Sequence, residues 1–290
     1  MRAAVIVDGR IEVHERPDPV PAKDEVLIRI RAAGLNNADL AQRAGRYPPP
    51  PGWPADIPGL ECAGELEDGT RVMALLGGGG QAELVAVHER YVVPVPEHLG
   101  FEEAGGFMEV FCTAHDALFT QARLQPGERL LVAGAAGGGG LAAVGLGLAT
   151  GARVTASARH SQERLRELGA GTEIDGDYDV ILELVGGDNL PANLDRLAIG
   201  GRIVVVGLGA GPRAEIDFGK LMRRRGRIFG TMLRARPLEE KALVVQRVRR
   251  HVLPLGLSVP VQEAFPLERA QDAYETFAAG GKFGKLVLTT

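Results

Sequence analysis

The sequence LLVAGAAGGGGLAAV, residues 130–144, joins a short apolar run to a glycine-rich turn and then to a helix-forming run. The apolar run predicts a buried strand, and the glycines are spaced G-x-x-G-x-x-G. A strand, a glycine turn and a helix in this order can hold the pyrophosphate of a dinucleotide, because glycine lets the backbone approach closely and the helix N-terminus offers N–H groups. The same spacing would also suit a turn that only packs a helix closely on its strand. We predict dinucleotide contacts at Gly134, Ala135, Ala136, Gly137, Gly138, Gly139 and Gly140.

The pattern of apolar residues differs on the two sides of this turn. Before it, short apolar or alternating runs predict strands at 4–7, 25–30, 70–75 and 82–87. Strands of this kind are typical of a small β-sandwich or barrel. From residue 101 on, helices predicted at 102–121, 161–168 and 189–197 alternate with strands at 153–157, 178–183 and 202–206. This alternation predicts a parallel sheet with helices on both faces. The C-terminal part predicts helices at 238–251 and 267–278 and strands near Val261 and at 285–288.

The end of the strand at 153–157 indicates which dinucleotide is bound. An NAD site usually has an acidic residue here that holds the ribose hydroxyls, whereas an NADP site has a cation for the 2′-phosphate. After Ser157 the chain has no carboxylate until Glu163, and it carries Arg159 and Arg164. We therefore predict NADPH as the cofactor, with Arg159 and Arg164 at the 2′-phosphate and a further cofactor contact at Ser157.

Composition narrows the class of protein. The 290 residues include 33 basic and 37 acidic side chains, a net charge of −4, with 45% hydrophobic residues. These values argue against disorder and against a basic nucleic-acid binder, and a short arginine-rich run at 223–227 fits a solvated helix end better. The uncharged stretch 130–152 is long enough to cross a bilayer, but eight of its residues are glycine, which disfavours a helix. With no signal peptide at residues 1–10, we expect a cytoplasmic two-domain enzyme that binds neither nucleic acid nor membrane.

Six further motifs point to a known family: GLNNADL (34–40), GRYP (45–48), IPGLECAG (57–64), GGRIVVVG (200–207), LRARP (233–237) and FGK (283–285). In this order they resemble the zinc-independent quinone oxidoreductases of the medium-chain dehydrogenase/reductase superfamily. The resemblance implies an α/β Rossmann domain at 112–237, inserted in a GroES-like β-barrel domain made of 1–111 and 238–290. It also implies an active site in the cleft between them and a homodimer formed through the Rossmann edge near 227–233.

The resemblance assigns roles to individual residues. It implies that Asn36 and Thr113 lie near the nicotinamide and that Tyr47 lines the substrate cleft, where it could donate a proton. We expect Tyr47 and Asn36 to be the catalytic residues. Further cofactor contacts are expected at Gly186, Gly207, Leu208, Phe283 and Lys285.

Metal ligands of the zinc-dependent relatives are missing from this chain. Those relatives have a cysteine and a histidine where this chain has Asn36 and Leu60, and two cysteines cannot form a four-cysteine structural site. We therefore expect no metal. Without a Lewis acid, hydride should pass to an acceptor activated by its own conjugation, a quinone or an α,β-unsaturated carbonyl. An enoyl-thioester reductase, which residues 59–64 also resemble, and a redox-silent NADPH-binding protein are the alternatives.

The chain is shorter than its relatives at one point of the Rossmann domain. Only residues 175–177 separate Ile174 from the strand predicted at Tyr178. Three residues span at most about 11 Å, and a parallel crossover takes a dozen residues or more. We therefore predict a third strand that is vestigial or absent, which leaves a five-stranded sheet.

Overall fold

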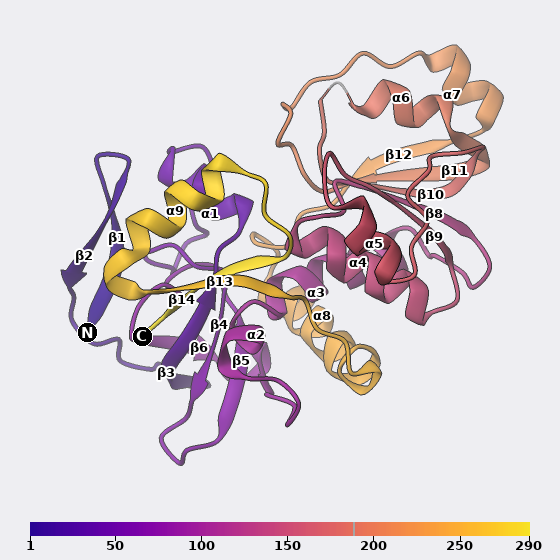
Figure 1. The fold of residues 1–290 in the computed structure, drawn as a ribbon. Helices are drawn as coiled ribbons and strands as arrows, with labels where there is room; N and C mark the ends of the chain where they lie inside the picture. The colour runs from indigo at the N-terminus through magenta and orange to yellow at the C-terminus, as the bar shows by residue number, and fades with distance from the viewer. Residues whose placement is uncertain (188) are drawn as a thin grey trace. The chain divides into compact units, whose positions relative to one another are not determined.

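A computed structural model describes residues 1–187 and 189–290 of the chain (Figure 1). It contains two compact units: the first domain is Met1–Cys112 with Leu233–Thr290, and the second domain is Thr113–Met232. The expected boundaries were after residues 111 and 237. Arg234 explains why residues 233–237 belong to the first domain, because its buried guanidinium donates to Gly77 O (2.8 Å) and Tyr47 O (2.9 Å) there.

One sheet of the first domain combines both ends of the chain. Its strand order is β13-β14-β3-β4-β5-β7, and β6 also pairs with β3. The long strand β3 (Glu25–Gly34) is its centre, since it pairs antiparallel with β14, β4 and β6. A separate hairpin, β1 with β2, precedes it. The other bounds are β1 (Arg2–Val7), β2 (Arg10–Glu15), β4 (Glu61–Glu65), β5 (Arg71–Leu75), β6 (Leu84–His88), β7 (Val92–Pro94), β13 (Val261–Pro266) and β14 (Lys285–Thr289).

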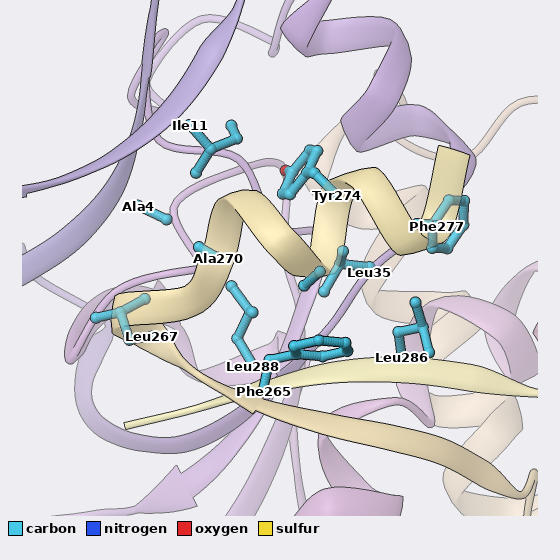
Figure 2. Packing of buried hydrophobic residues seen from close by; sticks show 11 residues of the cluster. Ala4, Ile11, Leu35, Phe265, Leu267, Ala270, Tyr274, Phe277, Leu286 and Leu288 are labelled. Atoms are coloured by element: carbon cyan, nitrogen blue, oxygen red, sulfur yellow. The ribbon is translucent and has the colours of Figure 1, made fainter. Parts of the chain in front are cut away.

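A core of apolar side chains fixes helix α9 (Ala270–Ala279) against this sheet (Figure 2). Phe265, Leu286 and Leu288 face the helix from β13 and β14, and all three are at most 2% exposed. Burying a side chain of this size stabilises the fold by about 1.5–3 kcal/mol. The core therefore holds the C-terminal strand β14 in the sheet. The remaining α-helices of the first domain are α1 (Asn37–Arg43), α2 (Phe101–Gly105), α8 (Leu238–His251) and most of α3 (Met108–His115).

The second domain is a parallel sheet covered on both faces. Its order is β12-β11-β10-β8-β9, with the bounds β8 (Arg129–Ala133), β9 (Arg153–Ser157), β10 (Tyr178–Glu183), β11 (Leu197–Val205) and β12 (Arg227–Gly230). In Figure 1, α4 (Gly138–Ala149) and α5 (Gln162–Glu167) lie on one face, and α6 (Asn189–Asp195) and α7 (Phe218–Arg224) on the other. Within the described part of the chain, β9 is extended only by a single parallel bridge from Thr155 to Gly171. That bridge stands at the position of the third strand.

One stretch differs from the sequence-based expectation, and a second, the uncharged stretch, agrees with it. The helix predicted over 102–121 is divided into α2, α3 and a π-helical segment at Asp116–Gln121. Helix α2 ends at Gly105, where a Cβ would lie 2.7 Å from the Ala32 side chain on β3, so close packing requires glycine there. The uncharged stretch 130–152 forms β8, the glycine turn and α4. Across the described residues, no helix combines the length and apolarity needed to cross a membrane.

Candidate active site

A buried ion pair lies at the start of two strands of the first domain. Lys285 Nζ on β14 is 2.6 Å from Glu61 Oε1 on β4, and the two side chains are 3% and 0% exposed. The strand between them, β3, makes room for the pair with glycine. A Cβ at Gly34 would overlap Glu61 Oε1 and lie 2.9 Å from Lys285 Nζ. The central strand therefore needs glycine at this position.

Asn36 is held in one orientation by this pair. Lys285 Nζ donates to Asn36 Oδ1 (2.8 Å), and Asn36 Nδ2 donates to Glu61 Oε1 (2.9 Å). A third bond from Lys285 Nζ reaches Leu35 O (2.8 Å), so all three ammonium hydrogens have acceptors in the first domain. Asn36 is half-buried, whereas the Lys285–Glu61 pair to which its amide is bonded is buried. These bonds give the Lys285 ammonium a positioning role, and its contact with a cofactor stays a prediction.

Asp39 ties the same region to the loop before β4. Its carboxylate is fully buried and accepts from the backbone N–H groups of Asn36 (2.7 Å) and Gly59 (3.0 Å). Burial raises the pKa of Asp39 to about 6, although these two bonds and the charges of Lys285 and Arg234 lower it. Asp39 therefore joins the residue before α1 to the loop before β4.

Glu109, in the first turn of α3, lies on the other side of Glu61. Its backbone N–H donates to Glu61 Oε2 (2.8 Å). Glu109 is half-buried, and desolvation, together with the negative charge of Glu61, raises its pKa to about 7. Sequence reasoning missed this residue, although a lone carboxylate inside the apolar run FMEVF (107–111) is a usable signal.

Lys241 was also missed. It is 2% exposed, and its ammonium lies over the rings of Trp53 (5.5 Å to the centroid) and Tyr91 (4.8 Å). Desolvation lowers the pKa of Lys241 to about 8. The signal was present in the sequence, because Lys241 shares a helical spacing with the buried Val245 and Val248.

Tyr47 is held by Arg234. The guanidinium lies over the tyrosine ring (5.0 Å to the centroid) and donates to Tyr47 O (2.9 Å). Burial, followed by the negative charge of Glu109, raises the pKa of Tyr47 above its usual value. The half-buried hydroxyl is therefore protonated at neutral pH and is able to donate a hydrogen bond. Phe283 is buried in the same domain, with its backbone N–H bonded to Gln262 Oε1 (2.7 Å).

The glycine turn of the second domain lies between β8 and α4. The backbone N–H groups of Gly134 and Ala135 both donate to Ser157 O (2.9 Å each), which fixes the turn beside the end of β9. Gly140 is needed for packing, since a Cβ there would lie 2.6 Å from Ala135 Cα. At Gly137 and Gly139 a Cβ would meet no protein atom within 4 Å. Helix α4 begins with Gly137 as its N-cap and no capping side chain, so a ligand can approach its first N–H groups.

The other residues predicted around the cofactor lie in the second domain, either just after the ends of its strands or, for Thr113 and Arg164, on helices. Arg159 and Arg164 are both exposed, and Arg159 follows Ser157 closely. Gly186, Gly207 and Leu208 are brought together, because a Cβ at Gly186 would lie 2.8 Å from Gly207 O and 2.9 Å from Leu208 Cα. Thr113, on α3, is the first residue of this domain.

A carboxylate that the sequence did not single out anchors this edge. Glu183, at the end of β10, is fully buried and accepts from the backbone of Val185 (2.6 Å) and Gly186 (2.8 Å) and from Asn189 Nδ2 (2.7 Å). It pairs in register with Ala133, directly before the glycine turn. Glu183 therefore holds the loop that carries Gly186 in place.

Comparisons with known proteins cover nearly the whole chain. Residues 22–97 match the family described as "Alcohol dehydrogenase GroES-like domain", and residues 160–288 match "Zinc-binding dehydrogenase". The mouse quinone oxidoreductase is 32% identical over 302 residues, covering 93% of this chain and 90% of the mouse protein. The chain belongs to the quinone oxidoreductase family.

Structural comparison agrees with this membership in the medium-chain dehydrogenase/reductase superfamily. The crystal structure of the quinone oxidoreductase from Thermus thermophilus, also described in complex with NADPH, matches with a TM-score of 0.89 and 35% identity, covering 100% of both chains. The curated relatives also include a phenolphthiocerol/phthiocerol polyketide synthase of Mycobacterium tuberculosis. It is 31% identical over the whole of this chain, which spans 15% of that much longer protein. Members of the quinone oxidoreductase family are oxidoreductases that act on small molecules.

The donor set of this family member does not fit zinc, despite the description of the matching C-terminal family. Asn36 and Leu60 replace the expected thiolate and imidazole, and the adjacent Glu61 is already bonded to the Lys285 ammonium. Burial raises the pKa of the neighbouring Cys62 thiol, which disfavours the thiolate that zinc requires. Within residues 1–187 and 189–290, no group of three or more histidine, cysteine, aspartate or glutamate side chains could hold a metal ion.

Proposed function

We propose that this chain is an NADPH-dependent reductase that transfers hydride to quinones or α,β-unsaturated carbonyls without a metal. The observation that carries the proposal is the Asn36–Glu61–Lys285 cluster. In this cluster the Lys285 ammonium donates to three protein oxygens, and one of them belongs to the Glu61 carboxylate. A simple ketone would lack a Lewis acid here, so the acceptor has to be activated by its own conjugation.

The second domain offers a fitting cradle for NADPH. The uncapped start of α4 and the open space at Gly137 and Gly139 suit a pyrophosphate, and Arg159 and Arg164 suit a 2′-phosphate. When bound, NADPH supplies the hydride. The Thermus relative, described in a complex with NADPH, supports this choice. The protein's own contribution is to orient both partners, with Asn36 at the nicotinamide and Tyr47 along the substrate cleft.

A second candidate is an enoyl-thioester reductase. The polyketide synthase relative, which matches over the whole of this chain, specifically favours it. The two activities share hydride transfer to the β-carbon of a conjugated carbonyl and differ in the group carried by the carbonyl. A thioester substrate therefore belongs in the same assay as free enones.

The test is a screen of NADPH oxidation over ortho- and para-quinones, 2-alkenals, enones and crotonyl-thioesters. We expect turnover with at least one conjugated acceptor, and deuteride from labelled NADPH at the β-carbon of an enone product. Asn36→Ala should impair turnover and Tyr47→Phe should reduce it modestly, whereas Asn37→Ala, at an exposed neighbour, should not. Oxidation of ethanol or benzyl alcohol without turnover of any conjugated acceptor would contradict the proposal. NADPH binding without any redox turnover would favour a binding protein instead.

The oligomeric state of the protein and its location in the cell belong to the same proposal. We propose a cytoplasmic homodimer that engages neither membrane nor nucleic acid. Support for the dimer comes from β12, an edge strand of the parallel sheet whose outer backbone groups have no strand beside them among the described residues. Such an edge is a template for pairing with a second copy.

A further inference from the structure

Two glutamates of the first domain lie next to each other in different environments. Glu61 is fully buried and ion-paired with Lys285. Glu109 is half-buried, and its backbone N–H is bonded to the other oxygen of the same Glu61 carboxylate. The Glu61 carboxylate is therefore fully used by its partners, whereas the Glu109 carboxyl group is the one whose protonated form is favoured, by desolvation and by the charge of Glu61.

Two residues of this cluster keep accessible surface. Asn36 donates to one oxygen of Glu61 through its side-chain amide, and Glu109 donates to the other through its backbone N–H. Both residues keep accessible surface, while Glu61 and Lys285 are buried. The proposed function puts Asn36 at the nicotinamide and Tyr47 along the substrate cleft. Glu109 is linked to both, because its backbone N–H is bonded to the carboxylate that holds Asn36 and its charge acts on Tyr47. Glu109 thus carries a carboxyl group in the same cluster as the residues assigned to the nicotinamide and the substrate.

We propose that Glu109 is the general acid of the reaction and protonates the α-carbon of an α,β-unsaturated carbonyl after hydride transfer. This inference rests on the proposed function. Hydride forms the new C–H bond at the β-carbon, and the electron pair of the C=C bond moves to give an enolate. The O–H bond of Glu109 then breaks, its proton forms a C–H bond at the α-carbon, and the carboxylate regains a proton from water. The sum is enone, NADPH and one proton giving the saturated carbonyl and NADP⁺.

The charges around Glu109 set the pH range in which it can act. Glu61 on β4 and Asp39 on α1 favour its protonated form, and Lys285 on β14 and Lys241 on α8 favour the carboxylate. Arg234 and Tyr47 also lie within electrostatic range of it. Desolvation is the largest effect, and the resulting pKa of about 7 leaves a useful fraction protonated at neutral pH.

The experiment compares Glu109→Gln with the wild type on a 2-methyl enone and on a quinone. General acids contribute about 10²–10⁴-fold, so we expect a loss of that size in kcat with the enone. Quinone reduction should change little, because the product oxygens take protons from water without help. In D₂O the wild type should place deuterium at the α-carbon with one configuration, and the variant should give a mixture.

Two pH measurements accompany the kinetics. Because the donor must be protonated, kcat/KM of the wild type with the enone should fall as the pH rises through about 7, and this fall should be absent in Glu109→Gln. Infrared difference spectroscopy of the enzyme without substrate should detect a carboxyl group that titrates in the same range and is missing in the variant. Glu102→Gln, at an exposed residue of α2, is the matched control and should leave both reactions unchanged.

Several results would overturn the proposal. Retention by Glu109→Gln of enone turnover, pH profile and single α-configuration would do so. An equal loss of quinone and enone reduction, in a variant whose thermal midpoint matches the wild type, would indicate a positioning role instead. If Glu109→Gln does not fold, Glu109→Asp must keep the single configuration at a reduced enone rate. A wild type that reduces quinones but no enone would overturn the role of Glu109 and leave the proposed function standing, whereas no turnover of any acceptor would remove both.

Discussion

Lys285 is a fully buried cation whose loss should be costly. Its ammonium is bonded to Glu61, Asn36 Oδ1 and Leu35 O. Removing one partner of a buried pair leaves an uncompensated charge and costs about 3–5 kcal/mol. We predict that Lys285→Met and Glu61→Gln each lower the free energy of unfolding by that amount in urea titrations. The double variant should lose less than the sum of the two, since no unpaired charge remains.

The control for this prediction is an exposed pair of the second domain. Lys220 and Asp195 form an ion pair with side chains 43% and 53% exposed. Such pairs are worth about 0–1 kcal/mol, so Lys220→Met should change the free energy of unfolding little. If Lys285→Met cost no more than Lys220→Met, the cluster would not be the organising element that its bonds suggest.

Arg159 and Arg164 are the residues on which the preference for NADPH depends. Hydrogen bonds to charged groups contribute about 1.5–3 kcal/mol, and this contribution is available only to a cofactor that carries the 2′-phosphate. Replacing both arginines with alanine should weaken NADPH by about 1–3 kcal/mol in calorimetry and leave NADH nearly unchanged. Equal losses for the two cofactors would show that the arginines do not read the 2′-phosphate.

At the start of helix α4, adding one methyl group distinguishes a glycine needed for packing from a glycine needed for ligand binding. At Gly140 a Cβ would lie 2.6 Å from backbone, so Gly140→Ala should lower the thermal midpoint and NADPH affinity together. At Gly139 a Cβ would meet open space, and alanine is about 0.5–1 kcal/mol better than glycine in a helix. Gly139→Ala should therefore keep or raise the thermal midpoint and still weaken NADPH, because its methyl group enters the space of the pyrophosphate. Unchanged NADPH affinity in Gly139→Ala would place the cofactor elsewhere.

Helix α1 makes the stability of the protein depend on pH through Asp39. The pKa of this carboxyl rises from 3.8 to about 6 in the fold, so the folded state holds the proton more tightly than the unfolded chain. Its contribution is therefore complete below about pH 4 and is lost as the pH rises through about 6. Relative to Asp39→Asn, which cannot titrate, the wild type should lose about 2 kcal/mol of unfolding free energy between about pH 4.5 and about pH 7.5. Urea titrations at the two pH values measure this difference, and a constant difference would contradict the assignment.

Local sequence patterns predict the helices and strands of this chain better than they predict the residues of the candidate active site. The glycine turn could be read from residues 130–144, because strand, turn and helix follow one another directly in the sequence. The cluster around Glu61 could not, because its partners Asn36 after β3, Glu109 on α3 and Lys285 on β14 come from distant parts of the chain. Asn36 was found only through the resemblance. Glu109 is marked in the sequence only as a lone carboxylate in the apolar run 107–111, and its environment exists only after folding.

The first domain depends on contacts between the two ends of the chain. Strand β14 pairs with β3, and Lys285 and Glu61 are separated by 224 residues in sequence. Such distant contacts close large loops and slow folding. The second domain, by contrast, is one continuous segment with its own buried core around Tyr178, Ile181 and Ile203. The candidate substrate side of the enzyme is therefore assembled from both ends of the chain, and the candidate cofactor side from its middle.

The proposed dimer can be tested at the edge strand β12 without disturbing the sheet. Thr231 N donates to Val205 O on β11 (3.1 Å). Because successive N–H groups of a strand point to opposite sides, the N–H of Phe229 also faces β11, and the N–H of Gly230 faces away from the sheet. Proline is tolerated only where no ladder bond is lost. Gly230→Pro should therefore remove an outward donor while leaving the domain folded.

We expect the wild type to sediment at twice the 30.7 kDa of the chain and Gly230→Pro to shift towards the monomer at an unchanged thermal midpoint. Phe229→Pro is the matched variant, since it removes a bond to β11 and should lower the thermal midpoint by destabilising the sheet itself. Sedimentation of both variants over a range of protein concentrations separates association from folding. A wild type that is monomeric at every concentration, or a Gly230→Pro variant that dimerises as well as the wild type, would show that β12 does not pair with a second copy.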